Sequence, residues 1–322
     1  MTDFMELVEK DLKKLEVSID KLISTKISFI KEIVNYIIKS GGKRVRPILV
    51  ILSAKLCGYR GDRHIPFAAI IEFIHTATLL HDDVVDNAGT RRGASTVNMV
   101  WGNEPSVLVG DFLYSKSFEL MSGEGNHEIM KIISQATTAL SEGEILEIIK
   151  TANIDTTEKD YFDIIGNKTA VLFSAACELG AILGNVTTKQ RDALKNFGYK
   201  LGIAFQLRDD ILDYTSYDDM LGKHVGTDLK EGKITLPFIH ALKSASAKEK
   251  LSVAKILKKR TISQKDFEWV SKLMEKYNGI GYASAATEKY LEDAKKHLEQ
   301  FPASRYKNAL LSLADSMLKR EK

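Results

Sequence analysis

The chain has 322 residues, of which 44% are hydrophobic and 28% are charged, as is usual for a soluble globular protein. Its formal net charge of +3, from 46 basic and 43 acidic residues, is too small to indicate a nucleic-acid surface, so we expect no nucleic-acid partner. The chain has only five prolines and no long Gly/Ser/Pro-rich linker, which favours a single domain over residues 1–322.

The cysteines and the first residues bear on the compartment. Cys57 and Cys177 stand in apolar helical contexts without the close spacing of a metal or redox motif, so we expect two reduced core residues. The opening stretch MTDFMELVEKDLKKLEV has no signal-peptide apolar region, and no stretch is long and apolar enough for a transmembrane segment. We therefore expect a soluble, cytoplasmic protein.

Apolar residues recur at three- and four-residue spacing along most of the chain, which predicts an all-α fold with little support for a sheet. In chain order, the predicted helices cover residues 4–19, 27–39, 47–56, 66–86, 105–121, 128–149, 158–183, 188–214, a segment that begins near 237, 264–277, 281–300 and 303–319. The segment 66–86 is apolar almost all round, so it is expected in the middle of a bundle. The stretch from Thr215 to Thr235 is predicted to be a long, functional loop.

An acidic triplet, DDVVD, ends the apolar segment 66–86. Asp82 and Asp86 are four residues apart, so on a helix both carboxylates leave the same face and would repel one another unless a cation lies between them. Mg²⁺ prefers oxygen ligands and typically bridges carboxylates and substrate phosphates. Asp83 lies about 100° round the helix, which favours a supporting or solvent-facing role.

A second acidic triplet, in GIAFQLRDDILDY, also ends an apolar helix and comprises Asp209, Asp210 and Asp213. If both helices point the same way in one bundle, the two triplets open into one cavity that holds several Mg²⁺ ions and a polyphosphate. Basic residues fit the same interpretation, because Arg and Lys are suited to phosphate contact. They are Lys43 and Arg46 beside a glycine pair, and Arg91 with Arg92 just after the aspartates.

The motifs GGKRVRP, IHTATLLHDDVVD, RRG, GDFL, GNKTA, GIAFQLRDDILD and LGKHVGTDLKEGKITLP follow one another between Gly41 and Pro237. With them the chain resembles the trans-isoprenyl diphosphate synthases, also called polyprenyl synthetases, of the long-chain type. The N-terminal helices and the last third fit only by their helical character. The resemblance implies a single-domain helical bundle of the isoprenoid synthase type with a central cavity, a homodimer, and Mg²⁺-dependent condensation of isopentenyl diphosphate with an allylic diphosphate.

The resemblance also implies a role for each motif residue. Three Mg²⁺ ions, together with the allylic diphosphate, would be held chiefly by Asp82, Asp86 and Asp209, supported by Asp83, Asp210 and Asp213. Isopentenyl diphosphate would be bound by Lys43, Arg46, His75 and Arg92. The allylic diphosphate would be bound by Arg91, Lys168, Thr169, Gln206, Lys223 and Lys233. The catalytic set is Asp82, Asp86, Asp209, Lys168 and Gln206.

Product length is predicted from the helix before the first aspartate. Ala77 and its neighbour Thr78 lie about one turn back from Asp82, where short-chain members of the family tend to carry an aromatic stopper. The small residue favours a tunnel and a product of C35 to C50, with octaprenyl (C40) as the centre, for the side chain of a respiratory quinone. Phe118 and Met121 are candidates for the tunnel floor.

Several alternatives stay open. A short- or medium-chain synthase making farnesyl or geranylgeranyl diphosphate would share every motif. A non-catalytic subunit of a heteromeric synthase would typically lack aspartates or basic residues that this chain keeps. A metal-dependent phosphohydrolase, suggested by His81 beside Asp82, would need a second His/Asp pair, and a terpene cyclase would leave Lys43, Arg46 and His75 without a purpose.

Overall fold

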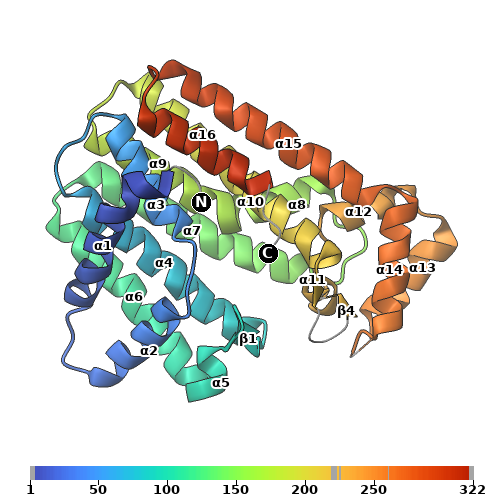
Figure 1. Ribbon diagram of the computed structural model, residues 1–322. Helices are drawn as coiled ribbons and strands as arrows, with labels where there is room; N and C mark the ends of the chain where they lie inside the picture. Colours follow the sequence, from blue (N-terminus) through green and yellow to red (C-terminus); the bar gives the residue numbers. More distant parts are fainter. Residues whose placement is uncertain (1–3, 219–222, 225, 260, 319–322) are drawn as a thin grey trace. The chain divides into compact units, whose positions relative to one another are not determined.

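A computed structural model of the protein describes residues 4–218, 223–224, 226–259 and 261–318 (Figure 1). Helices account for nearly all of its regular structure, as the apolar spacing predicts. Within these ranges the strands form two short antiparallel pairs, β1 (Thr90–Arg91) with β2 (Ala94–Ser95) and β3 (Tyr217–Asp218) with β4 (Lys223–His224). The fold class is therefore all-α.

The helices of the first half of the chain are α1 (Phe4–Leu22), α2 (Ser28–Lys39), α3 (Val45–Leu56), α4 (His64–Val85), α5 (Val97–Trp101), α6 (Asn103–Gly123), α7 (His127–Lys150) and α8 (Glu158–Ile165). The second half begins with a π-helix, η1 (Gly166–Ala170), and continues with α9 (Val171–Leu183), α10 (Thr188–Thr215), α11 (Thr227–Lys230), α12 (Leu236–Ser244), α13 (Ala247–Leu257), α14 (Gln264–Lys276), α15 (Gly279–His297), the 3₁₀-helix η2 (Leu298–Gln300) and α16 (Arg305–Leu318).

The contacts within the chain divide it into two compact units that alternate along the sequence. Unit one comprises the described residues up to 137, with 175–195 and 300–310, and unit two comprises 138–174, 196–299 and the described residues from 311 onward. The first aspartate motif lies in unit one and the second in unit two. That the whole chain is one domain stays a prediction.

Helix α4 is the centre of unit one, because its apolar residues face neighbours on several sides. It packs against α1, α3 and α6, and Phe67, Ile70 and Phe73 are fully buried along it. The prediction of a helix in the middle of a bundle is confirmed. The ring of His81 lies against Gly110 of α6, where an added Cβ would lie 2.3 Å from Nε2 of His81.

Unit two has its own apolar core around α12, which packs against α8, α14 and α15. Leu207 of α10, Phe238 of α12, Val253 of α13 and Val270 of α14 are fully buried in one continuous cluster. Capping boxes mark the starts of α13 and α14, with Ser246 and Ser263 each accepting a hydrogen bond from the third backbone amide of its helix. This packing fixes the helices on which the second aspartate motif is mounted.

Several predicted elements need correction. The helix predicted over 158–183 is interrupted by η1, and the loop predicted over 215–235 contains β3, β4 and α11. Helix α13 was not predicted, nor was α5, because the first is largely polar and the second is only one turn long. Helices α3 and α4 begin at Val45 and His64, two residues before the prolines that were taken as their starts.

Of the two cysteines predicted in the core, Cys177 is buried, whereas Cys57 is only partly buried at the end of α3. Both are unpaired thiols, and burial raises the pKa of each to about 12. Within the described ranges, none of the helices has the length and apolarity needed to span a bilayer.

Candidate functional site

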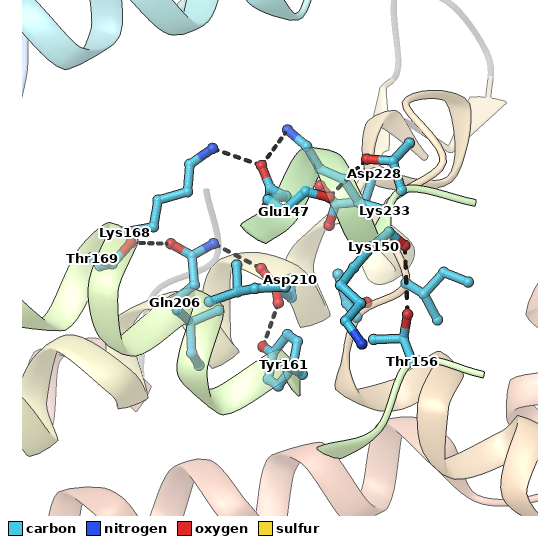
Figure 2. Close-up of a pocket in the computed structure, with 15 residues that line it drawn as sticks. Glu147, Lys150, Thr156, Tyr161, Lys168, Thr169, Gln206, Asp210, Asp228 and Lys233 are labelled. Carbon is cyan, nitrogen blue, oxygen red and sulfur yellow. Dashed lines mark hydrogen bonds and ion pairs between the residues drawn. The ribbon is translucent and has the colours of Figure 1, made fainter. Parts of the chain in front are cut away.

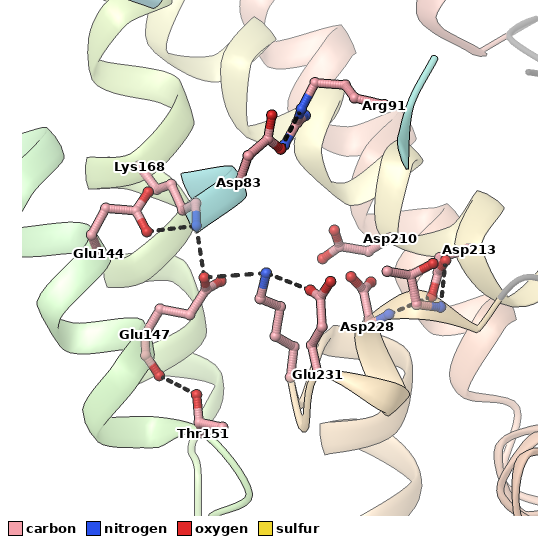
Figure 3. A network of polar contacts seen from close by, with 12 residues as sticks. Asp83, Arg91, Glu144, Glu147, Thr151, Lys168, Asp210, Asp213, Asp228 and Glu231 are labelled. Carbon is pink, nitrogen blue, oxygen red and sulfur yellow. Dashed lines mark hydrogen bonds and ion pairs between the residues drawn. The ribbon is translucent and has the colours of Figure 1, made fainter. Parts of the chain in front are cut away.

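The first aspartate motif ends α4 in unit one. The backbone N–H of Asp86 donates to the carbonyl of Asp82 at 2.8 Å, so these two residues stand one helical turn apart. Asp83 is buried, and its Oδ1 accepts from Nε of Arg91 at 2.8 Å and lies 2.7 Å from Arg91 Nη2. Arg91 therefore neutralises a buried carboxylate within unit one, rather than reaching only toward a substrate (Figure 3).

A basic cluster surrounds His75 in the same unit. Desolvation by burial, and then the charges of Arg46, Arg92, Arg91 and Arg44, hold the pKa of His75 well below its usual 6.5, so the imidazole is neutral. A Cβ on Gly42 would lie 2.8 Å from Arg92 Nη1, which shows how closely that guanidinium covers the glycine pair. The charges of Arg46 and Arg92, two of the residues predicted for isopentenyl diphosphate, thus act on a third, His75.

Arg44 and Glu72 were not predicted, although they anchor the junction between the loop that carries Lys43 and the first turn of α3, which carries Arg46. Arg44 adopts the left-handed conformation, with φ of 48°, at the start of α3. Its guanidinium pairs with the buried carboxylate of Glu72 and donates to the carbonyl of Ile38 at 2.7 Å. The signal in the sequence is Glu72 itself, a carboxylate inside an apolar helix that requires a buried cation.

The residues predicted to set product length lie on α4. Ala77 is fully buried, and the Thr78 hydroxyl donates to the carbonyl of His75 at 2.8 Å. On α6, which packs against α4, Met121 is buried and Phe118 is partly buried. The placement fits an apolar wall beside the first aspartate motif.

The second aspartate motif, on α10 in unit two, is held by protein partners. Asp210 is buried, and its two carboxylate oxygens accept from Tyr161 Oη at 2.5 Å and from Gln206 Nε2 at 2.8 Å. Burial raises its pKa to about 7 against the opposing effect of these hydrogen bonds. Asp213 accepts from the backbone amides of Thr227 and Asp228 at 3.0 and 2.9 Å, which ties α10 to the turn that begins α11.

A cavity of about 100 Å³ lies in unit two and gathers five of the predicted residues (Figure 2). They are Lys168, Thr169, Gln206, Asp210 and Lys233. They come from η1, from α10 and from the segment after α11, which are distant in sequence. The Thr169 hydroxyl donates to Gln206 Oε1 at 2.8 Å, so a hydrogen-bonded chain runs from Thr169 through Gln206 to Asp210 and Tyr161.

Acidic residues of α7, which were not predicted, pair with Lys168 and Lys233 of this cavity. Lys168 Nζ lies 2.7 Å from Glu144 Oε2 and 2.7 Å from Glu147 Oε2 (Figure 3). Lys233 Nζ lies 3.6 Å from the same oxygen of Glu147 and 2.7 Å from Glu231 Oε2. In the sequence, Glu144 and Glu147 look like part of the solvent-exposed face of an amphipathic helix. Only their spacing of three residues indicates that they could contact the same partner.

Asp228 also lines the cavity and was not predicted. Desolvation, followed by the charges of Asp210 and Asp213, raises its pKa well above 3.8. Clustered carboxylates that resist ionisation are expected where a cation or polycation normally binds, and such perturbed groups mark functional sites. Half of its neighbours in TDLKEGK are charged, so in the sequence it resembles part of a solvated loop.

Two predictions cannot be placed. The side chain of Lys223 lies outside the described residues. In the part of the chain that the structure describes, no three His, Cys, Asp or Glu side chains converge as a preformed metal cage. A cavity shared by the two aspartate motifs therefore stays a prediction.

The sequence of this chain matches those of known proteins over most of its length. The family model described as polyprenyl synthetase matches residues 27–274. The octaprenyl diphosphate synthase of Escherichia coli (strain K12) is 37% identical over 320 residues, covering 98% of each chain. Other relatives are named for nonaprenyl, heptaprenyl and geranylgeranyl products.

Solved structures agree with the fold. The decaprenyl diphosphate synthase of Rhodobacter capsulatus superposes with a TM-score of 0.94 at 39% identity, covering 99% of this chain and 98% of that one. The polyprenyl synthase of Caulobacter crescentus CB15, described as complexed with calcium and isoprenyl diphosphate, gives a TM-score of 0.93 at 36% identity, with coverage of 99% and 97%. These likenesses cover 98–99% of the chain. The chain belongs to the polyprenyl synthetase family of prenyltransferases.

Proposed function

We propose that this enzyme condenses isopentenyl diphosphate sequentially onto an allylic diphosphate, with farnesyl diphosphate as the primer, to give an all-trans product of about C40. The observation that carries the proposal is the cavity of unit two, which gathers Lys168, Thr169, Gln206 and Lys233 in a member of this family. We assign this cavity to the diphosphate of the allylic substrate. The product would serve as the side chain of a respiratory quinone.

The chemistry of the cavity suits departure of a diphosphate. Ionisation of the allylic C–O bond leaves a delocalised carbocation and adds negative charge to the leaving oxygen. The ammonium groups of Lys168 and Lys233 can stabilise that charge, and more strongly in a small cavity than in water. The amide of Gln206 is fixed between Thr169 and Asp210, so its orientation needs no rearrangement during the reaction.

We assign isopentenyl diphosphate to the basic cluster of unit one. The charges of Arg46 and Arg92 act on the buried, neutral His75 there, and Lys43 lies in the loop just before α3. One guanidinium group can donate two parallel hydrogen bonds to diphosphate oxygens, and a neutral imidazole can donate one further hydrogen bond. Binding there would hold the substrate double bond in place to attack the carbocation and form the new C–C bond. The cation left by this attack would then lose a proton to the released diphosphate.

The aspartates fit magnesium by their donor chemistry. Asp82 and Asp86 offer hard carboxylate oxygens one helical turn apart, and Asp209, with Asp210 and Asp213 in support, offers a second set. Burial raises the pKa of Asp210 and of Asp213, as expected for carboxylates that need a cation nearby. We propose three Mg²⁺ ions, which when bound supply charge neutralisation at the diphosphate.

Replacement of the first aspartate tests this assignment. Asp82→Ala should lower kcat by orders of magnitude, because it removes a ligand of the ion that stabilises the leaving group. The Mg²⁺ concentration at half-maximal rate should rise at the same time. Circular dichroism should show an intact fold, and a near-normal rate with folded protein would mean that the aspartate does not bind magnesium.

Octaprenyl is the centre of the proposed range of products, since relatives over nearly the full length are named for octaprenyl synthesis. The small, fully buried Ala77 favours the long-chain class over farnesyl or geranylgeranyl synthesis. The relatives are named for products that range from geranylgeranyl to nonaprenyl, so membership of the family does not by itself determine the length of the product.

We also propose a cytoplasmic homodimer that is active without a second type of subunit. Both aspartate motifs and the basic residues are intact, which argues against a non-catalytic subunit. Large apolar side chains stay exposed on α7, where Ile145, Ile148 and Ile149 form one face at helical spacing. Exposed apolar faces of this kind usually meet a partner.

The decisive experiment is incubation of the purified chain with farnesyl diphosphate, isopentenyl diphosphate and Mg²⁺, followed by mass-spectrometric sizing of the products. We expect an all-trans series that ends near C40. Products no longer than C20 would favour the short- or medium-chain alternative. Absence of elongation by the chain alone would favour a non-catalytic subunit, and phosphate release without elongation would favour a phosphohydrolase.

A further inference from the structure

The π-helix η1 carries Lys168 and Thr169, and it rests on α7 at a glycine. A Cβ built on Gly143 would lie 2.8 Å from the backbone nitrogen of Lys168 and 2.9 Å from the Cβ of Asn167. Neither atom can rotate away, because one belongs to the backbone and the other is bonded directly to it. Helix α7 and η1 can therefore approach this closely only because residue 143 has no side chain.

The same stretch of α7 also fixes the Lys168 ammonium group. Glu144 follows Gly143 directly and Glu147 lies one turn further on, and each places a carboxylate oxygen 2.7 Å from Lys168 Nζ. The oxygen of Glu147 that contacts Lys168 also lies 3.6 Å from Lys233 Nζ. Two like charges thus converge on a single carboxylate oxygen, and without its negative charge they would repel one another.

Helix η1 is an exception to the surrounding α-helical geometry. π-Helical turns are rare, cost stability, and are often found where function requires a side chain to be aimed differently. Here the turn sends Lys168 and Thr169 into the cavity, where Thr169 contacts Gln206. A Cβ on Gly202 of α10 would lie 2.6 Å from the Cα of Ala170, so η1 is fitted closely on that side as well.

We propose that Gly143 and Glu147 are positioning residues of the allylic diphosphate site. Gly143 sets the depth of η1 in the cavity, and Glu147 keeps the ammonium groups of Lys168 and Lys233 close enough to meet oxygens of one diphosphate. The inference rests on the proposed function, because it takes the cavity of unit two as the allylic site. Pre-organised cations bind an anion more tightly than cations that must first be brought together.

Gly143→Ala tests the steric half. It should raise the KM for farnesyl diphosphate by between about tenfold and a hundredfold, as expected for a misplacement of about 1 Å, and leave the KM for isopentenyl diphosphate unchanged. Gly123→Ala is the matched control, since it makes the same change on a helix where a Cβ meets nothing within 4 Å. An unchanged KM for farnesyl diphosphate, or an equal rise in both KM values, would overturn this half of the inference.

Glu147→Gln tests the electrostatic half, with Glu142→Gln, an exposed glutamate on the same helix, as the control. Glu147→Gln should also raise the KM for farnesyl diphosphate about tenfold, because the lysines lose their shared counter-ion while the isopentenyl diphosphate site is untouched. Glu147→Asp, which keeps the charge, should recover part of the loss. If Glu147→Gln instead lowers this KM, the carboxylate competes with the substrate and does not position the lysines.

Lys168→Ala separates this inference from the proposed function. If Lys168→Ala leaves the KM for farnesyl diphosphate unchanged, the cavity is not the allylic site and both proposals fail. If it raises that KM while Gly143→Ala and Glu147→Gln do not, the site assignment stands and only the positioning role is lost. Melting temperatures of all variants, measured by circular dichroism, identify any that are unfolded.

Discussion

At the residue scale, buried charge distinguishes the functional side chains from their neighbours. Asp83 is neutralised by Arg91, Glu72 by Arg44, and Lys168 by Glu144 and Glu147. Each of these buried or partly buried charges is thus compensated within its own unit, as the cost of desolvating a charge requires. His75 differs from them, because its cationic surroundings and its burial both act against protonation.

His75 gives a prediction for the pH dependence of stability. Its pKa is lowered in the folded state, so below about pH 6.5 the unfolded chain binds a proton that the native protein does not, and stability falls as pH falls. The contribution of this residue to the slope is at most about 1.4 kcal/mol per pH unit. In His75→Gln, the free energy of unfolding, measured with urea between pH 7.5 and pH 5.5, should therefore decrease less than in the native protein. If the free energy of unfolding decreases equally in His75→Gln and in the native protein, the lowered pKa does not belong to His75.

At the scale of elements, periodicity predicted the long helices because each buries one or more apolar faces. It missed η1, since the residues from 158 to 183 keep a helical pattern through the π-turn and no proline breaks it. Motif resemblance placed Lys168 and Thr169 in the site without indicating that geometry. Glu144, Glu147 and Asp228 were missed because their roles depend on partners that only the folded chain brings near.

Helix α4 carries the prediction about product length. Ala77→Phe should shorten the product while the first condensation continues, because the larger ring blocks the proposed tunnel below Asp82. Overpacking a fully buried position should also cost about 1–3 kcal/mol of stability. Mass spectrometry of the products measures the change in length.

Leu79→Phe is the control for Ala77→Phe, since two residues along a helix correspond to a rotation of about 200° and place the new ring on the opposite face. Its products should keep the native length. If Ala77→Phe also leaves product length unchanged, the tunnel does not run along this face of α4.

At the scale of the whole molecule, the division into two units could not be read from the sequence, because the units alternate along the chain. Each holds one aspartate motif and one group of bases that we propose to bind a diphosphate: Arg46 and Arg92 with His75 in unit one, Lys168 and Lys233 in unit two. This separation gives each proposed diphosphate its own binding surface. Condensation would then require isopentenyl diphosphate and the allylic diphosphate to be bound at the same time, one on each surface.

Oligomeric state is the remaining property at this scale. On α7, Ile145, Ile148 and Ile149 are 57%, 57% and 65% exposed, which is costly for three large apolar side chains on one helix face. We expect this face to be covered by a second copy of the chain. Ile148→Lys should therefore shift the protein from dimer to monomer in analytical ultracentrifugation, because a charge at the centre of an apolar contact is desolvated without a partner. Leu251→Lys, at a similarly exposed leucine on α13, should leave the dimer intact. A dimer that persists in Ile148→Lys, or a native protein that is monomeric, would show that α7 does not form the subunit contact.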